Sequence, residues 1–476
     1  MTIKALGLRL KFHYTAQLIC PALTIGCFMA KDLTQGEISP LLYRLTAPMV
    51  MGIMAMFLFN LVDTYFISLL GTQPLAAVSF TFPVTMLVMN MAIGLSIATG
   101  AVVARSLGQK DHDQAKQWIG SSVYLSVVIS VCIALTGIFI QEPIFKMLGA
   151  SVELIPMIAA YMDWWFTGSV FLVVLIVINA SIRATGNTKL PSLVMLFSAV
   201  LNGILDPLLI FGIGPFPELG IKGAAIATFI AWVMAFMVIL RVLMRQDLIT
   251  FQFSFHMASQ WKKLLSLGIP AALTNMLGPI ANGILVAWVA KYGTVAVAAY
   301  GVGSRLEPLA LIVIMAFTAS LPPFVGQNLG AGQHQRIEDA LKKSIQFIFV
   351  WQLLVYVFLC LLASPISQLF SEDESVQKVI QIFLYIVPMS YAGLGISLVS
   401  TATLNSLHKP RISLAINALR LFVLYVPLAW IGNNWWGLTG LFWGCAIANL
   451  LLGITVMGAF QKVRNDNAWR TKLLSV

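Results

Sequence analysis

Two aspartates within otherwise apolar stretches are the residues of this sequence best suited to chemistry. They are Asp63 and Asp206, and Asn202 precedes Asp206 by one helical turn. An ionisable side chain inside a bilayer costs about 2.5 to 3.5 kcal/mol on membrane-insertion scales, so each one is a functional candidate. Asp63, Asp206 and Thr228 each lie about seven or eight residues, roughly 11 Å, from the outer end of an expected helix. Three helices therefore supply oxygen atoms at one depth.

These groups predict one of two kinds of ion chemistry. Two carboxylates, the Asn202 amide and the Thr228 hydroxyl would bind a small hard cation such as Na⁺ through oxygen. Alternatively, the two carboxylates share protons, because desolvation and like charge both oppose their ionisation. The residue types leave H⁺ and Na⁺ as open alternatives.

Three further residues extend this candidate site in the first half of the chain. Phe59 and Asn60 precede Asp63 by four and three residues, so all three share one helix face. Asp163 lies about ten residues into an expected helix and reaches a similar depth. The tryptophans at 164 and 165 beside it also fit a position in the membrane interface.

The second half carries a different set of charges. Leu285 stands where an internal repeat, described below, places the counterpart of Asp63, and no Asp or Glu occurs between Asp247 and Glu307. Its candidates for buried charge are Glu307 and Arg420, each about ten residues into an expected helix. We expect them either to form an intramembrane ion pair or to line the transport path.

The composition places all of these residues in a membrane. Of the 476 residues, 59% are hydrophobic and 10% are charged, whereas soluble proteins are roughly a quarter charged. The apolar residues form runs long enough to cross a bilayer as helices. We predict an all-α integral membrane protein with 12 transmembrane helices. Their expected ranges are 43–70, 75–104, 117–141, 152–181, 189–213, 220–244, 264–290, 297–326, 341–365, 376–404, 411–432 and 437–461.

The basic residues indicate the orientation of these helices. Lysine and arginine concentrate in alternate loops and in the carboxyl-terminal tail, which places both termini in the cytoplasm. The net charge of +11 is thereby explained without a nucleic-acid partner. Five isolated cysteines show no spacing typical of a metal site or a redox motif.

An internal repeat divides the chain into two halves. Identical residues recur 222 positions apart, from Leu42 and Leu264 to His112 and His334. Two six-helix lobes in the same orientation are parallel repeats, an arrangement that places a transport site between the halves. We expect an amino-terminal segment, a first lobe, a cytoplasmic linker, a second lobe and a tail at 1–40, 41–245, 246–263, 264–463 and 464–476. Residues 1–28 look signal-like without a clear cleavage site, so Met29 is an alternative start.

Several motifs together resemble the MATE (multidrug and toxic compound extrusion) family, a branch of the MOP superfamily. They are Asn60-Leu61-Val62-Asp63, Val103-Ala104-Arg105-Ser106-Leu107-Gly108, Arg183-Ala184-Thr185-Gly186-Asn187, Asn202 with Asp206-Pro207, and Gly326-Gln327-Asn328-Leu329-Gly330-Ala331-Gly332. The likeness covers about residues 40 to 460. Within the family the chain is similar to the DinF-type branch.

The resemblance implies a coupling-cation site in the first lobe. It would consist of Asp63, Asn202, Asp206 and Thr228. The NorM-type branch has an important glutamate in the seventh helix, where this chain has Gly278. Phe59 stands where the DinF-type branch often has a tyrosine, which leaves the hydrogen-bond network around Asp63 open.

The expected function is export of amphipathic organic cations in exchange for H⁺ or Na⁺, by alternating access between two lobes. A flippase for lipid-linked precursors from the same superfamily is the alternative. A membrane enzyme is disfavoured, because the five histidines form no metal-binding motif, and we expect no cofactor. A major-facilitator carrier would have a basic Gly-Asp-Arg loop after its second helix, which is missing. We expect a monomer in a prokaryotic inner membrane.

Overall fold

The computed structural model describes residues 32–246, 248–249 and 257–465, and its large compact unit begins at Asp32. All of its regular elements are helices within these ranges. Those of the first half are α2 (Ile38–Ser68), α3 (Thr72–Gly108), α4 (His112–Met147), α5 (Ile155–Ala184), α6 (Lys189–Ile210) and α7 (Ile221–Arg245). Those of the second half are α8 (Met257–Val289), η3 (Ala290–Tyr292), α9 (Thr294–Ala310), α10 (Ile312–Gly330), α11 (His334–Leu361), α12 (Ala363–Phe370), α13 (Glu374–Ile386), η4 (Pro388–Ser390), α14 (Tyr391–Ser406), α15 (Pro410–Ala418), η5 (Leu419–Tyr425) and α16 (Val426–Asn465).

The lengths and hydropathy of these helices fit twelve membrane spans. Eleven stretches of the described residues are long and apolar enough to cross a bilayer. The last of them, Pro410–Gly458, is interrupted at Trp436 and Gly437, whose backbone angles are not helical, so it provides two spans. The predicted all-α membrane fold is thus confirmed.

Two helices that the sequence predicts as continuous are interrupted near proline residues. The expected span 297–326 is divided at Leu311 into α9 and α10, three residues after Pro308. The expected span 376–404 is divided between α13 and α14, where η4 begins at Pro388. Proline lacks the N–H that a helix needs for its internal hydrogen bonds, which explains the interruption at Pro388. The bond that Pro308 cannot make would reach back into α9, so this proline lies before the break at Leu311 without accounting for it.

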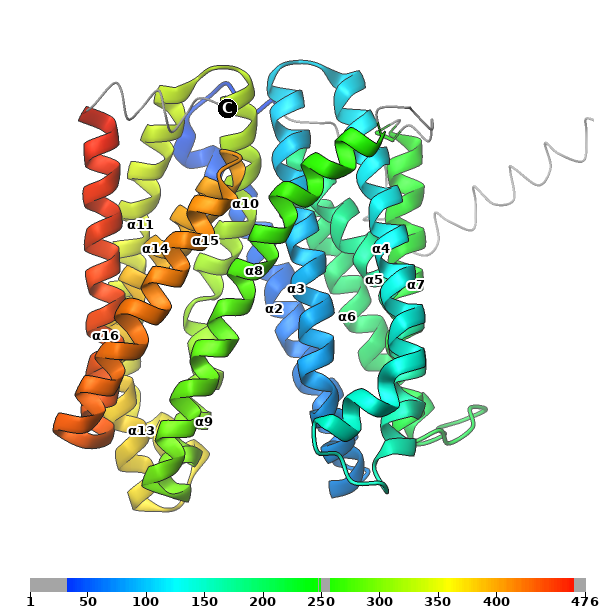
Figure 1. Ribbon diagram of the computed structural model, residues 1–476, viewed down its shortest axis with the longest axis vertical. Coiled ribbons are helices and arrows are strands. Elements are labelled where there is room, and N and C mark those ends of the chain that lie inside the picture. Colours follow the sequence, from blue (N-terminus) through cyan, green and yellow to red (C-terminus); the bar gives the residue numbers. More distant parts are fainter. Residues whose placement is uncertain (1–31, 247, 250–256, 466–476) are drawn as a thin grey trace, which may run out of the picture. The chain divides into compact units, whose positions relative to one another are not determined.

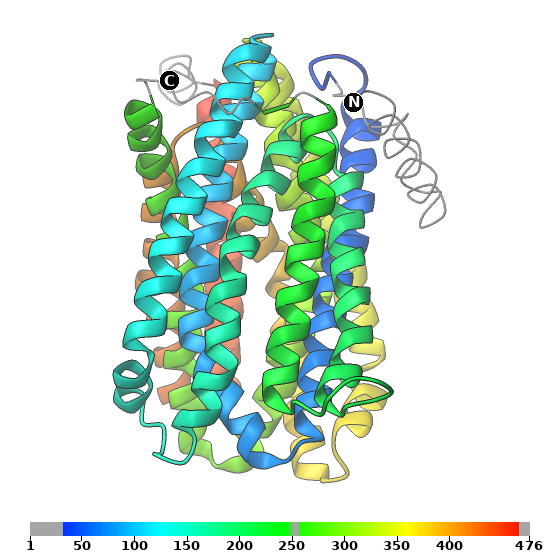
Figure 2. The same ribbon diagram turned by 90° about the vertical axis from the view of Figure 1, so that its right-hand side faces the viewer.

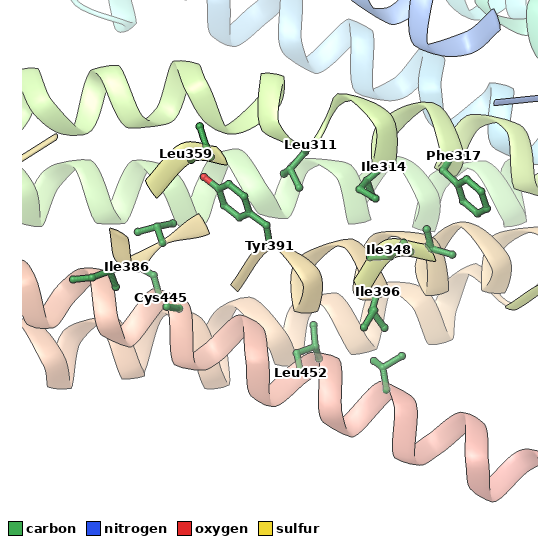
Figure 3. Packing of buried hydrophobic residues seen from close by; sticks show 14 of the residues in the cluster. Leu311, Ile314, Phe317, Ile348, Leu359, Ile386, Tyr391, Ile396, Cys445 and Leu452 are labelled. Carbon is green, nitrogen blue, oxygen red and sulfur yellow. The ribbon is translucent and has the colours of Figure 1, made fainter. Parts of the chain in front are cut away.

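The helices pack around two large apolar cores, and the core of the second half also includes Leu33, Ile38, Leu42 and Leu45 from the start of the first half. In Figure 1, α4, α5 and α7 gather on one side, and α11, α14 and α16 gather on the other. Figure 2 shows the long helices running side by side. The second-half core surrounds Tyr391, which is 1% exposed and lies between Leu311 and Leu359 in Figure 3. Many large apolar side chains remain exposed on the outer helices, as contact with lipid requires.

The internal repeat is visible in the backbone itself. Left-handed φ angles occur at Gly71 (108°) and Gly293 (89°), which are counterparts in the repeat. The same spacing relates Lys110 to Gly332 and Gly186 to His408, all of which have φ between 59° and 81°. Gly220 and Gly437 form a fourth pair, at a slightly shorter spacing. The turns between helices have therefore kept one geometry in both halves, even where the residue differs.

The two halves meet through close contacts of small residues. A Cβ added to Gly94 in α3 would lie 2.5 Å from the carbonyl oxygen of Gly268 in α8. A Cβ added to Gly108 would lie 2.0 Å from the carbonyl oxygen of Gln327 in α10. The Gln327 side chain also donates to the carbonyl of Ala184 in α5, at 2.9 Å. We call the contact of Gly94, Gly108 and Ala184 with Gly268 and Gln327 the interlobe seam.

Candidate functional site

Three helices of the first half bring the predicted coupling residues together. The Asn202 side-chain nitrogen on α6 lies 3.1 Å from Asp206 Oδ1 and 3.2 Å from Thr228 Oγ1 on α7, and it donates to both. The spacing of four residues places Asn202 and Asp206 on one face of α6. Asp63 on α2 lies within electrostatic range of Asp206. A Cβ at Gly203 would lie 3.9 Å from Val62 Cγ1, which shows how closely α2 and α6 approach here.

Three oxygen atoms of this cluster lack a hydrogen-bond donor. They are Asp63 Oδ1, Asn202 Oδ1 and Asp206 Oδ2, and all three are buried. Asn202 and Asp206 are 0% exposed. Buried polar atoms are almost always hydrogen-bonded, so three such acceptors in one place require explanation. A bound cation would satisfy them through oxygen, and a proton on either carboxyl group would turn an acceptor into a donor.

Tyr161 on α5 also belongs to this cluster, although the sequence-based prediction did not include it. Its side chain is buried, and it lies within electrostatic range of both Asp63 and Asp206. It precedes Asp163 by two residues, and two residues turn an α-helix by about 200°. That rotation directs Tyr161 toward the carboxylates and leaves Asp163 exposed. The sequence of α5 is apolar on all sides, so it gave no signal for this rotation.

Asp163 and Asn60 are placed outside the cluster of unpartnered oxygens. Asp163 is exposed, and its carboxylate accepts a hydrogen bond from Gln141 Nε2 on α4 at 2.6 Å. Asn60 is also exposed, and its amide donates to the carbonyl oxygen of Met56 at 2.8 Å. Phe59, half-buried on the same helix, contributes no oxygen. Asp63, Asn202, Asp206 and Thr228 thus come together without these three.

The two charged candidates of the second half lie near each other without pairing. Glu307 Oε2 accepts a hydrogen bond from the Tyr391 hydroxyl at 3.4 Å. Arg420 lies within electrostatic range of Glu307, but no salt bridge joins these two described residues. The Nε and Nη1 atoms of Arg420 are buried without an acceptor. Of the two alternatives expected for Glu307 and Arg420, the ion pair does not form in this part of the structure, and a place on the transport path stays a prediction.

Comparison with known proteins matches both halves of the chain. The MatE family model covers residues 48–208 and again residues 270–431. The FAD transporter of Shewanella oneidensis is 41% identical over 90% of this chain and 96% of its own length. The multidrug export protein MepA of Staphylococcus saprophyticus is 27% identical over 87% of this chain and 91% of its own length.

Solved structures agree with these sequence matches. The MATE transporter VcmN of Vibrio cholerae, crystallised in a bent form, is 34% identical and superposes with a TM-score of 0.87. That likeness covers 91% of this chain and 98% of VcmN. A MOP superfamily transporter from Pyrococcus furiosus is 26% identical, with a TM-score of 0.84 over 94% of this chain and 99% of its own. The chain therefore belongs to the MATE family, as a multi-pass transporter of the bacterial plasma membrane and not an enzyme.

Proposed function

We propose that this transporter is a cation-coupled exporter whose coupling residues are Asp63 and Asp206. The observation that carries the proposal is the convergence of three buried, unpartnered oxygens from Asp63, Asn202 and Asp206. Thr228 and Tyr161 complete the shell around them. Either H⁺ or Na⁺ would neutralise the two neighbouring carboxylates.

Neutralisation of these carboxylates supplies the physical link between ion and cargo. Two like charges in one buried site repel each other, so the cation-free site is costly in any state that excludes water. An ion that binds one access state more tightly than the other shifts the population between them. A cargo with the opposite preference is then moved in exchange, because coupling of two binding equilibria is reciprocal.

For the cargo, we infer a flavin dinucleotide as the first candidate. The supporting observation is the 41% identity, over 90% of the chain, to a protein that is an FAD transporter. Amphipathic organic cations are the second candidate, supported by the carboxylates of the first half and by the 27% identity to a multidrug export protein. The matched relatives named above offer no support for the lipid-linked precursor alternative.

The decisive experiment uses purified protein in liposomes. A proton gradient and a sodium gradient are imposed separately, and movement of FAD and of ethidium is measured under each. We expect one gradient to drive FAD transport at least about tenfold above the rate without a gradient. Equal rates with and without both gradients would refute cation coupling. Ethidium transport without FAD transport would reverse the order of the two cargo candidates.

A further inference from the structure

Arg420 is the buried charge that the proposed coupling mechanism does not use. Its side chain is 8% exposed, and its Nε and Nη1 atoms have no hydrogen-bond acceptor. An unpaired cation in a membrane helix is costly, and such residues usually face a partner or a transport path. The structure offers no protein acceptor for these two donors among the described residues, so an acceptor from outside the protein is the natural partner.

The backbone around Arg420 is unusual. Arg420 lies in η5, a π-helical segment in which the Val426 N–H donates to the carbonyl of Leu421, five residues back. Single π-helical turns inside longer helices occur frequently at functional sites. The segment joins α15 to α16 in the chain and packs against α8, and the Arg420 side chain is buried there. Its position is therefore fixed by packing and does not depend on an ion pair.

The nearest carboxylate does not compete for the guanidinium. Glu307 lies in electrostatic range of Arg420 but receives its hydrogen bond from Tyr391. Tyr425, five residues after Arg420 and also nearby, has its hydroxyl engaged with the Cys445 thiol, so it offers no acceptor to the guanidinium. A guanidinium with free donors presents a planar fork that matches two oxygens of a phosphate group.

The place of Arg420 in the internal repeat supports a role in transport. When the left-handed Gly437 is aligned with its counterpart Gly220, Arg420 falls on Gly203, the immediate neighbour of Asn202. In the first half, this helix turn carries the Asn202 amide close to Asp206. In the second half, the corresponding turn carries the Arg420 cation. The two lobes present opposite charge in corresponding turns.

We propose that Arg420 binds the anionic phosphate or diphosphate group of the cargo. This inference rests on the proposed export of a flavin dinucleotide, whose diphosphate is the group concerned. The first lobe then takes the coupling cation, and the second lobe takes the negative end of the cargo. The bidentate fork, and not charge alone, gives the site its preference for phosphate over a single-point anion.

A ligand-stability assay tests the anion site without requiring flavin transport. Thermal unfolding of the purified protein is followed with increasing inorganic pyrophosphate. We expect the wild type and Arg411→Gln to be stabilised equally, because Arg411 is an exposed arginine nine residues before Arg420. Arg420→Gln should lose the stabilisation, and Arg420→Lys should retain only part of it. Stabilisation of Arg420→Gln equal to that of the wild type would overturn the proposal.

Transport in liposomes then tests the chemical preference. FAD, FMN and riboflavin carry a diphosphate, a monophosphate and no phosphate, respectively. We expect Arg420→Gln to lower transport of FAD and FMN at least about tenfold, as loss of a charge-assisted bond implies, while any riboflavin transport changes less than about twofold. Equal losses for all three flavins would show a structural role and contradict the proposal.

The remaining outcomes separate this inference from the proposed cargo. A wild type that carries no flavin but is stabilised by pyrophosphate through Arg420 would refute the flavin cargo and keep the anion site. A protein stabilised by phosphatidylglycerol micelles and not by pyrophosphate would assign Arg420 to a lipid headgroup, which overturns a cargo site.

Discussion

The two halves of this transporter share a backbone and differ in their charges. Each half turns at left-handed residues that match in sequence position, such as Gly71 with Gly293 and Gly186 with His408. Among the described residues of the first half, Asp63 and Asp206 carry the buried carboxyl oxygens that lack a hydrogen-bond partner. The second half holds the unpaired Arg420 and a single nearby carboxylate, Glu307. A repeated fold can therefore present two different sites to one transport path.

The largest expected effect comes from removing the first-half charge. Asp63→Asn should fold normally and lose ion-driven transport by at least about a hundredfold, because a neutral amide does not alternate between charged and neutral states. Gradient-driven uptake into liposomes measures this. The matched control is Asp163→Asn, since Asp163 is an exposed aspartate bonded to Gln141. A loss in the control as large as that of Asp63→Asn would contradict the assignment.

A second test asks whether Asp63 and Asp206 act as one site. Asp206→Asn alone should reduce coupled transport at least about tenfold, and adding Asp63→Asn should cost little more than the larger single effect. Residues that act as a unit show this strong non-additivity. The measurement is a double-mutant cycle on initial rates. Multiplicative losses would mean that the two aspartates serve separate steps.

The third test breaks the contact between the halves and leaves both sites unchanged. Gly108→Ala would place a Cβ 2.0 Å from the Gln327 carbonyl oxygen, so the interlobe seam cannot close as it does in this structure. We expect transport to fall several-fold with little change in ligand-induced stabilisation, because only the balance of access states is altered. Gly100→Ala, on the same helix, would meet Ala180 at an ordinary 3.9 Å. Equal losses of transport in Gly108→Ala and Gly100→Ala would contradict this role of the interlobe seam.

The smallest expected effect concerns His408, a titratable residue in a turn of the second half. Its counterpart in the first half, Gly186, has no side chain to titrate. Burial, together with the positive charges of Arg105, Lys263 and Lys409, lowers the pKa of His408 to about 4. A histidine that titrates at about 6.5 when unfolded then binds its proton more weakly when folded. Stability should therefore fall as the pH drops from about 6.5 toward 4.

His408→Asn checks this linkage. Asparagine tolerates the left-handed φ of 59° at this position. Thermal unfolding of the variant should change less between pH 7 and pH 5 than that of the wild type. Equal pH dependence in the two proteins would remove His408 as the cause.

Much of the fold could be predicted from the sequence, because length and hydropathy identify membrane helices. The repeat was visible from identical residues such as Leu42 and Leu264. The interruptions at Leu311 and Pro388 were missed, because an apolar run does not reveal whether neighbours will tolerate a break. Proline identity alone did not distinguish these places, because Pro48, Pro83 and Pro207 lie inside continuous helices.

The candidate site was only partly predictable, for a different reason. Asn202 and Asp206 are four residues apart on one helix, so their proximity follows from helical geometry. The contribution of Tyr161 depends on the rotation of α5 about its axis, which apolar sequences on all sides leave undefined. The separation of Glu307 from Arg420 depends on the path of η5, and nothing in the local sequence predicts a π-helical turn.

The paired left-handed turns also reflect the origin of the chain. We infer that the two halves descend from one duplicated ancestor, since Gly186 and His408 both have a positive φ, 81° and 59°, at equivalent places in the repeat. Glycine reaches that conformation without strain, whereas histidine adopts it less readily. Divergence after duplication could thus change the charge inside the bundle, while the places where the chain reverses direction were inherited almost unaltered.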